Sequence, residues 1–338
     1  MNVRATRAAR SGPPAGRRPR VAVTRPALPG PGLERLAGQV DLVRWAEPRP
    51  PTAGELTGLL ADADGLLCLT TERIDATLLG ACPTLRVVSN AGVGFDNLDL
   101  PALTSRGIPA GNTPGVLTET TADLAWALIL AASRRVVEAD RYVREGRWTA
   151  VVFDLLLGRD VHGATLGIVG YGAIGRAVAR RARGFDMTVL HHARQKGDDE
   201  LSRWVPLDEL LRRADVVTLH TPLTPETLGL IGAREIALMK PTAVLVNTSR
   251  GPIVDQAALA RALVEGRLFA AGLDVTAVEP IPPDDPLLGL PNCIVLPHIG
   301  SGSLATRSRM VELAVDNVLA GLAGERLPHC VNPEVYAG

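Results

Sequence analysis

Leu166-Gly-Ile-Val-Gly170-Tyr-Gly172-Ala-Ile-Gly175-Arg-Ala-Val-Ala179 is the stretch that decides the fold of this chain. A short apolar run with strand character passes through three closely spaced glycines and continues into a helical pattern. Gly170 would allow a tight reversal, Gly172 would let the backbone approach a pyrophosphate, and Gly175 would let the helix pack closely on the strand. The phosphates would then lie at a helix N-terminus, where free N–H groups favour negative charge.

Glycine triplets also arise by chance, and this chain of 338 residues contains 34 glycines. Here, however, a strand pattern precedes the triplet, a helix pattern follows it, and a second strand over 187–190 arrives at the spacing of one βαβ unit. The stretch therefore predicts a dinucleotide-binding domain. Its expected cofactor-binding residues are Gly170, Gly172, Ala173, Ile174 and Gly175.

Strand and helix patterns alternate on both sides of this unit. We expect strands over 20–24, 42–45, 65–69, 85–89, 216–220, 243–248, 270–275 and 294–296, and helices over 53–61, 74–79, 207–213, 233–239, 256–265 and 303–319. A further helix over 118–132 is apolar on nearly every side, which predicts burial at a domain junction or a subunit interface. Residues 134–163 are expected to be irregular. This alternation predicts parallel sheets covered by helices.

The composition narrows the class of protein. The length suggests about two domains, and 46% hydrophobic with 21% charged residues is typical of soluble globular chains. Residues 1–20 hold six arginines and no acid, so with an overall formal charge of zero the remainder carries 0 − 6 = −6. This charge disfavours a nucleic-acid partner. Residues 1–20 are expected to form a disordered basic tail.

Membrane and metal sites are not expected. No apolar run reaches the roughly 18 residues that a membrane helix needs. Cys68, Cys82, Cys293 and Cys330 lack metal-ligand spacing and are interpreted as reduced thiols of a cytoplasmic protein. The adjacent residues His191 and His192 would point to opposite sides of a strand end, so they do not predict a metal pair.

Four more motifs occur in a fixed order along the chain. Asn90-Ala-Gly92-Val-Gly94-Phe-Asp96-Asn97 follows the strand that ends at Ser89, where open α/β sheets bind ligands. The others are Val246-Asn-Thr-Ser-Arg250-Gly-Pro-Ile-Val-Asp255, Ala271-Gly-Leu-Asp274-Val-Thr-Ala-Val-Glu279-Pro280 and Leu296-Pro-His298-Ile-Gly-Ser301. With the glycine stretch, they resemble the D-isomer-specific 2-hydroxyacid dehydrogenases from about residue 21 onward, most closely the glyoxylate/hydroxypyruvate reductase branch.

The resemblance implies two Rossmann-like, doubly wound parallel-sheet domains of the α/β class with a cleft between them. Residues 21–112 plus 301–338 would form a discontinuous, flavodoxin-like substrate-binding domain. Residues 113–300 would form the NAD(P)-binding domain. The two crossings between domains would act as a hinge, and closure would exclude water from the hydride path.

The implied reaction transfers a hydride from NAD(P)H to a small 2-keto acid and gives the D-2-hydroxy acid. Arg250 would hold the substrate carboxylate and reach the ketone oxygen with its fork of donors, and the backbone amides of Val93 and Gly94 would complete the substrate site. His298 would contact the substrate and donate the proton, since imidazole has an ordinary pKa of about 6.5. Glu279 would fix the ring's tautomer. Arg250, Glu279 and His298 are the expected catalytic residues.

The expected cofactor site extends beyond the glycine stretch to Ala193, Arg194, Thr221, Pro222, Thr248, Ser249, Asp274 and Gly300. Asp274 would accept a hydrogen bond from the nicotinamide carboxamide, although a structural pair with an arginine is an alternative. Ala193 stands where NAD-binding relatives carry an acid, and Arg194 and Lys196 follow it. Without that acid a 2′-phosphate is not repelled and Arg194 can pair with it, so NADPH is preferred, with NADH possible. Solvated loop charge is the other interpretation of Arg194 and Lys196.

Several alternatives remain open. Leu69, Thr70 and Thr71 are candidates to contact the substrate but do not identify it, so 2-ketogluconate-type and D-lactate-type specificities stay open. A phosphoglycerate dehydrogenase often has a further regulatory domain, for which the residues after His298 leave no room, and formate dehydrogenases carry Gln where Glu279 stands. A non-catalytic, nucleotide-sensing corepressor is a candidate of another class. A homodimer through the apolar helix 118–133 is also expected.

Overall fold

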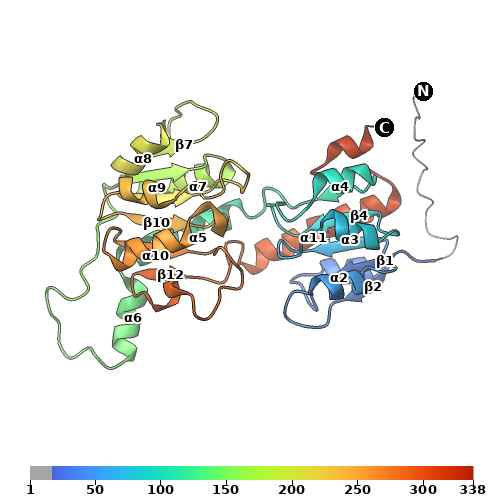
Figure 1. The fold of residues 1–338 in the computed structure, drawn as a ribbon, viewed down its shortest axis with the longest axis horizontal. Helices are drawn as coiled ribbons and strands as arrows, with labels where there is room; N and C mark the ends of the chain where they lie inside the picture. The colour runs from blue at the N-terminus through green and yellow to red at the C-terminus, as the bar shows by residue number, and fades with distance from the viewer. Residues whose placement is uncertain (1–16, 338) are drawn as a thin grey trace. The chain divides into compact units, whose positions relative to one another are not determined.

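The computed structural model describes residues 17–337, and these form two compact units. The unit boundaries fall between Val116 and Leu117 and between Ser303 and Leu304. The second unit is therefore an insertion in the first, and the chain crosses between them twice (Figure 1). The domain boundaries expected from the sequence lie between residues 112 and 113 and between residues 300 and 301. Over residues 17–337, no helix is long and apolar enough to cross a membrane.

The first unit is built on a five-stranded parallel sheet. Its strands are β1 (Arg20–Val23), β2 (Asp41–Arg44), β3 (Gly65–Cys68), β4 (Val87–Asn90) and β5 (Ala110–Gly111), in the order β2-β1-β3-β4-β5. This order is the flavodoxin-like one, and its switch point lies between β1 and β3. The flavodoxin-like prediction is therefore confirmed. A ligand site is expected at the carboxyl ends of β1 and β3.

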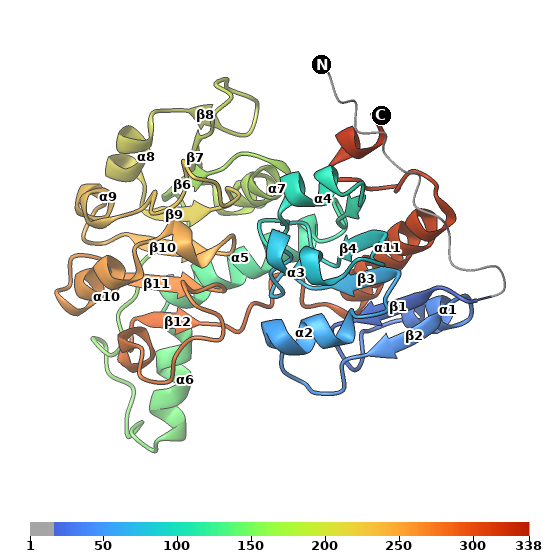
Figure 2. The same cartoon turned by 45° about the vertical axis from the view of Figure 1, so that its right-hand side comes forward.

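Helices cover both faces of this first sheet (Figure 2). The helices are α1 (Gly32–Ala37), α2 (Ala53–Leu59), α3 (Ala76–Ala81), α4 (Leu100–Ser105) and α11 (Leu304–Ala323). One core contains Leu56, Leu79 and Leu103, from α2, α3 and α4. A second core contains Leu36 of α1 and Val315 of α11. The strands read as continuous apolar runs because side chains on both faces are buried.

The second unit is built on a seven-stranded parallel sheet. Its strands are β6 (Thr165–Val169), β7 (Thr188–His192), β8 (Arg203–Trp204), β9 (Val216–Leu219), β10 (Val244–Asn247), β11 (Ala270–Leu273) and β12 (Cys293–Val295). The order β12-β11-β10-β9-β6-β7-β8 is that of a dinucleotide-binding Rossmann sheet with one added strand. Its switch point lies between β6 and β9, and the glycines at 170, 172 and 175 follow directly after β6.

Two helix layers also enclose the second sheet. α5 (Thr118–Ser133) and α7 (Ala173–Ala182) share one core, in which Trp126 and Val178 are buried. α8 (Leu207–Arg213), α9 (Ala233–Leu238) and α10 (Gln256–Val264) share the other, in which Leu211 and Leu259 are buried. α5 contacts α7, β10 and β11, which accounts for its buried face, while Leu124, Ala127 and Leu130 are not fully buried.

The expectation that residues 134–163 are irregular is wrong for α6 (Val136–Arg144). This helix begins after Arg135, which pairs with Glu138, and carries an Arg144–Asp140 pair one turn apart. α6 buries no residue, although Val136, Val137 and Val143 are apolar and exposed. Val136, Ala139 and Val143 recur at helical spacing, so the sequence carried a signal for this helix that the polar residues around it obscured. The short elements α1, α4, β5 and β8 were also not expected.

Most of the expected basic tail, residues 1–16, lies outside the described residues. Its last four residues belong to the first unit. Arg17 pairs with Asp64 at 2.8 Å, Arg18 donates to the carbonyl oxygens of Ala37 and Gly38, and Arg20 begins β1. The predicted disorder is therefore wrong for residues 17–20.

Candidate active site

The glycine stretch turns at the switch point of the second sheet. Gly170 has a φ of 93°, and a Cβ there would lie 2.5 Å from the backbone of His220 and Thr221. A Cβ on Gly175 would overlap the carbonyl oxygen of Gly170. These two glycines therefore let the loops after β6 and β9 and the start of α7 approach one another. A Cβ on Gly172, in contrast, would meet nothing within 4 Å.

The space beside Gly172 fits a pyrophosphate. α7 begins at Ala173, and no side chain caps it at Gly172. The first N–H groups of a helix have no intrahelical partner and favour an anion. An uncapped helix start beside a glycine with open space is the geometry that a dinucleotide requires.

The end of β7 is where the adenosine ribose of a dinucleotide would lie. Ala193 follows β7 directly, so no carboxylate stands at that position, and Arg194 is exposed. The hydrogen bond from Thr224 and, to a smaller extent, the charge of Arg194 lower the pKa of Glu226 in the loop after β9.

His220 connects the ends of β9 and β10. Its Nε2 lies 2.9 Å from the hydroxyl of Thr218, and its Nδ1 lies 3.4 Å from the hydroxyl of Thr248. Burial lowers the pKa of His220 to about 3, so the ring is neutral at physiological pH. Thr221 and Pro222, two of the expected cofactor residues, follow directly and therefore lie at the same sheet edge as Gly170.

Asn247 organises the turn that carries Arg250. Its side-chain oxygen accepts hydrogen bonds from the backbone N–H and the hydroxyl of Ser249, at 3.0 and 2.8 Å. Its side-chain nitrogen donates to the carbonyl oxygen of Arg250 at 2.9 Å. The guanidinium of Arg250 donates back to the Ser249 carbonyl at 2.8 Å. A buried asparagine at the end of β10 thereby fixes both ends of this turn.

Gly251 brings the Arg250 turn against the loop that carries Glu279. A Cβ on Gly251 would overlap the carbonyl group of Thr276. The backbone N–H of Thr276 donates to a Glu279 carboxylate oxygen at 3.2 Å. Gln256 holds the same loop, because its side-chain oxygen accepts from the N–H of Ala277 at 2.8 Å. The absent side chain at 251 is therefore what lets the two loops meet.

His298 and Glu279 form a hydrogen-bonded pair, with 2.7 Å between the ring Nδ1 and the carboxylate Oε2. Burial acts to raise the pKa of Glu279, but the hydrogen bond and the charge of His298, with smaller contributions from Thr276 and Arg250, leave this pKa below its ordinary value. Glu279 is thus ionised at neutral pH. An ionised carboxylate at Nδ1 leaves Nε2 as the nitrogen that can serve a substrate.

Asp274 holds the turn that contains His298. His298 has a φ of 53°, in the left-handed region that non-glycine residues rarely adopt. The buried carboxylate of Asp274 accepts from the N–H groups of Ile299 and Gly300, each at 2.7 Å, and its carbonyl accepts from His298 N–H at 3.0 Å. Thr121 of α5 donates to the Gly300 carbonyl at 3.1 Å.

The carboxylate of Asp274 has hydrogen-bonding capacity beyond these contacts. Burial raises the pKa of its carboxyl despite the two backbone N–H donors. A carboxylate has about four acceptor sites, so two remain after the two backbone N–H donors are satisfied. The side chain of Asp274 accepts from backbone N–H groups of the turn that contains His298. Within residues 17–337, no ion pair between Asp274 and an arginine is observed.

In the first unit, the expected substrate residues lie in the loop after β4. Asn90 donates to the Gly94 carbonyl at 2.6 Å, and Asn112 donates to the Val93 carbonyl at 2.8 Å. Both bonds use carbonyl groups, so they hold the loop without occupying its N–H groups. The side chain of Val93 is partly exposed.

A metal site is not formed by the described part of the chain, where no group of three or more His, Cys, Asp or Glu residues could hold a metal ion. His191 is buried, stacks on Tyr171 at 3.9 Å between ring centroids and binds the hydroxyl of Ser202. Its role is in packing.

Sequence reasoning missed Asn247, Thr121 and His220. A polar residue at a strand end is a turn signal, and Asn247 could have been found on that basis. Thr121 contacts Gly300 and His220 contacts Thr248, so these contacts join segments distant in the chain. A local sequence pattern does not predict such contacts.

The family profile described as D-isomer specific 2-hydroxyacid dehydrogenase, NAD binding domain, matches residues 126–300. A glyoxylate reductase of Korarchaeum cryptofilum is 51% identical over 94% of this chain and 97% of its own length. A glyoxylate/hydroxypyruvate reductase B of Escherichia fergusonii is 46% identical over 91% and 96%.

Solved structures agree with these relatives. An NADPH-dependent glyoxylate/hydroxypyruvate reductase of Sinorhizobium meliloti, in complex with NADP and malonate, has a TM-score of 0.83 and 34% identity, covering 94% of this chain and 98% of its own. Two Rossmann-type sheets, the order of the motifs and these similarities lead to one conclusion. This chain belongs to the D-isomer-specific 2-hydroxyacid dehydrogenase family, in its glyoxylate/hydroxypyruvate reductase branch, and is an NAD(P)-dependent oxidoreductase that acts on CH–OH groups.

Proposed function

We propose that this enzyme reduces glyoxylate or hydroxypyruvate to the D-2-hydroxy acid with NADPH. The observation that carries the proposed chemistry is the His298–Glu279 pair, held beside the Arg250 turn in the unit with the glycine loop. The glyoxylate reductases at 51% and 46% identity support the choice of substrate, and the missing acid at Ala193 supports NADPH. The alternative substrates, among them 2-ketogluconate, pyruvate and phosphohydroxypyruvate, would use the same groups.

Each catalytic group has one task in the proposed reaction. Arg250 holds the substrate carboxylate and the ketone oxygen, and the N–H groups of Val93 and Gly94 complete the carboxylate site. When bound, the nicotinamide supplies the hydride. His298 gives its Nε2 proton to the oxygen as negative charge develops there. Glu279 accepts from Nδ1 and stabilises the charged ring.

A substrate panel tests this assignment. Glyoxylate, hydroxypyruvate, pyruvate and 2-ketogluconate are each measured with NADPH and with NADH. The highest kcat/KM is expected for glyoxylate or hydroxypyruvate with NADPH. Cofactor binding without turnover of any keto acid would instead favour the corepressor-like alternative.

Arg194→Ala tests the preference for NADPH. Because a guanidinium–phosphate contact is worth about 1.5–3 kcal/mol, KM for NADPH should rise about 10- to 100-fold, while KM for NADH changes little. Arg261→Ala is the matched control, since this exposed arginine lies in the last turn of α10, before β11 and thus at the opposite edge of the sheet. An unchanged ratio of the two KM values would refute the role of Arg194.

A two-fold homodimer is also proposed. The partner surface would include the face of α5 that its own unit leaves uncovered, where Asp123 and Ala127 are exposed. Exposed apolar side chains follow α5 on α6 and the next segment, namely Val136, Val137, Val143, Trp148, Val151, Val152, Phe153 and Leu157. Sedimentation should show a dimer for the wild type and a monomer for Phe153→Asp, whereas Leu228→Asp, at another exposed apolar residue, should remain a dimer. A monomeric wild type would contradict the proposal.

A further inference from the structure

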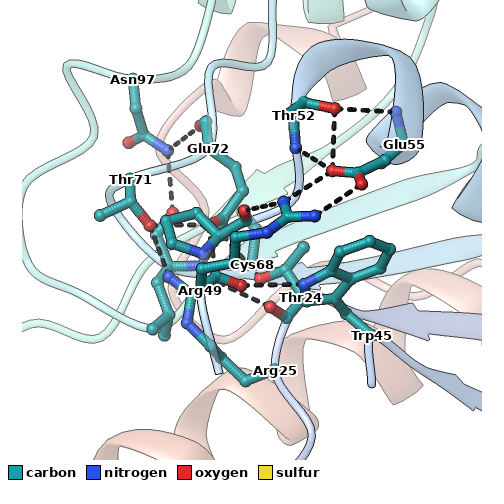
Figure 3. Close-up of polar contacts among 12 residues, drawn as sticks. Thr24, Arg25, Trp45, Arg49, Thr52, Glu55, Cys68, Thr71, Glu72 and Asn97 are labelled. Carbon is teal, nitrogen blue, oxygen red and sulfur yellow. Dashed lines mark hydrogen bonds and ion pairs between the residues drawn. The ribbon is translucent and has the colours of Figure 1, made fainter. Parts of the chain in front are cut away.

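Glu72 is a buried carboxylate at the switch point of the first sheet. It follows β3, and its side chain is 0% exposed. Figure 3 shows Glu72 among Thr24, Arg25 and Thr71. Charged side chains are rarely buried to this degree unless every polar atom has a partner. The reaction proposed above assigns Glu72 no chemical task.

Four donors satisfy the carboxylate completely. Oε1 accepts from the guanidinium of Arg25 at 2.8 Å and from the hydroxyl of Thr71 at 2.6 Å. Oε2 accepts from the backbone N–H of Leu69 at 2.8 Å and from the hydroxyl of Thr24 at 2.6 Å. A carboxylate offers about four acceptor sites, so none is left over.

These contacts join the loop after β1 to the loop after β3. Thr24 and Arg25 follow β1, and Leu69 and Thr71 follow β3. The guanidinium of Arg25 also donates to the Thr71 hydroxyl at 2.7 Å and to the Thr24 carbonyl at 2.6 Å, so it bonds to both loops. The two loops are therefore held by one connected set of charge-assisted hydrogen bonds.

The loop after β4 is fixed to the same point. The side-chain nitrogen of Asn97 donates to the carbonyl oxygens of Glu72 and Leu69, at 2.9 and 3.2 Å. A Cβ on Gly92 would lie 2.7 Å from the side chain of Thr70, so the loops after β3 and β4 are in direct contact. β1, β3 and β4 are parallel neighbours, and all three loops emerge at one edge of the sheet.

We infer that Glu72 is a positioning residue for the keto acid, because it fixes the segment 69–71 and, through Asn97, the Val93–Gly94 amides in one arrangement. This inference rests on the proposed function, in which these segments contact the substrate. It assigns to Glu72 the geometry of the substrate site and not a step of the reaction. The expected signature is a change in KM for the keto acid at nearly constant KM for NADPH, since the expected cofactor residues belong to the other unit.

Glu72→Gln is the decisive variant. Each carboxylate oxygen accepts one N–H that cannot become an acceptor, from Arg25 on Oε1 and from Leu69 on Oε2. Whichever way the glutamine amide turns, its NH₂ group faces one of these donors. KM for glyoxylate should rise about 10- to 100-fold, with kcat changed about threefold or less and KM for NADPH changed about twofold or less.

Glu55→Gln is the matched control. Glu55 also pairs with an arginine, Arg49, at 2.7 Å, and it accepts from the Thr52 N–H at 2.8 Å at the start of α2 (Figure 3). Its hydrogen bonds remain within residues 49–55 of its own loop. KM for glyoxylate should therefore be unchanged in Glu55→Gln, whatever happens to the melting temperature.

A milder pair of variants covers the case in which Glu72→Gln does not fold. Thr24→Val removes one donor to Oε2, and Thr24→Ser retains it. KM for glyoxylate should rise about 3- to 10-fold in Thr24→Val and return to the wild-type value in Thr24→Ser. If folded Glu72→Gln or Thr24→Val keeps the wild-type KM, the inference is overturned even if stability falls.

Amide hydrogen exchange separates this inference from the proposed function. The Leu69 N–H should exchange faster in Glu72→Gln than in Glu55→Gln, and so should amides of residues 93–97. If the wild type reduces no keto acid, the proposed function fails and exchange alone decides whether Glu72 holds the loops. Unchanged exchange in both segments would overturn the inference.

Discussion

Arg250→Lys is expected to lower kcat/KM for glyoxylate by about 10²- to 10³-fold, because a lysine cannot hold a carboxylate and a ketone oxygen at once. Hydrogen bonds to charged groups contribute about 1.5–3 kcal/mol each, and the substitution weakens two of them. Since the ketone oxygen gains charge during reduction, both KM and kcat should worsen. Steady-state kinetics with glyoxylate at saturating NADPH measures this.

The design of this variant isolates the fork from the charge. Lysine keeps the positive charge that helps to lower the pKa of Glu279, so the His298–Glu279 pair should persist. Asn247 accepts from Ser249 and donates to the backbone of residue 250, and these bonds do not depend on the side chain at 250. NADPH affinity, measured by fluorescence, should therefore stay close to the wild-type value. Equal activity of Arg250→Lys and the wild type would reject the carboxylate-holding role.

The fold could be predicted from the sequence because its strands are buried on both faces. Val244–Asn247 and Gly65–Cys68 are buried at every position, so they appear as apolar runs between turn residues. Helices with a core to cover, such as Leu207–Arg213, were placed with the observed bounds. α6 was missed although Val136, Ala139 and Val143 recur at helical spacing, because the polar residues of 134–163 outweighed that signal. Strand ends shifted by at most two residues because hydrogen-bonded pairing, and not hydrophobicity, determines where a strand ends.

The candidate site was predictable where motifs carry the chemistry. The motifs pointed to Glu279 and His298, and the structure places the carboxylate Oε2 and the ring Nδ1 of these residues 2.7 Å apart. It did not show why His298 adopts a left-handed backbone or what holds it there, because the two N–H bonds to Asp274 depend on the turn itself. The buried position of Glu72 could not be predicted for a similar reason. Its four partners come from two loops, and a lone acid in a sequence resembles a surface residue.

His298→Asn is the second variant with a large expected effect. Asparagine adopts the left-handed region more readily than most residues, so it fits a φ of 53° and should keep the Ile299 and Gly300 N–H groups on Asp274. The variant therefore removes the proton donor and not the turn. We expect kcat for glyoxylate to fall about 10²- to 10⁴-fold, the usual contribution of a general acid, while NADPH affinity is retained. A near-normal kcat would exclude His298 as the acid.

Glu279 provides an independent measure of the same pair. In the wild type, burial acts to raise the pKa of this carboxyl, and the hydrogen bond and charge of His298 are the main influences that reverse it. Without the imidazolium, burial has less opposition, so the pKa of Glu279 should rise in His298→Asn. Carboxyl titration by NMR measures this shift. An unchanged Glu279 titration would mean that the ring does not stabilise the carboxylate, and the pairing that supports proton donation from Nε2 would lose its basis.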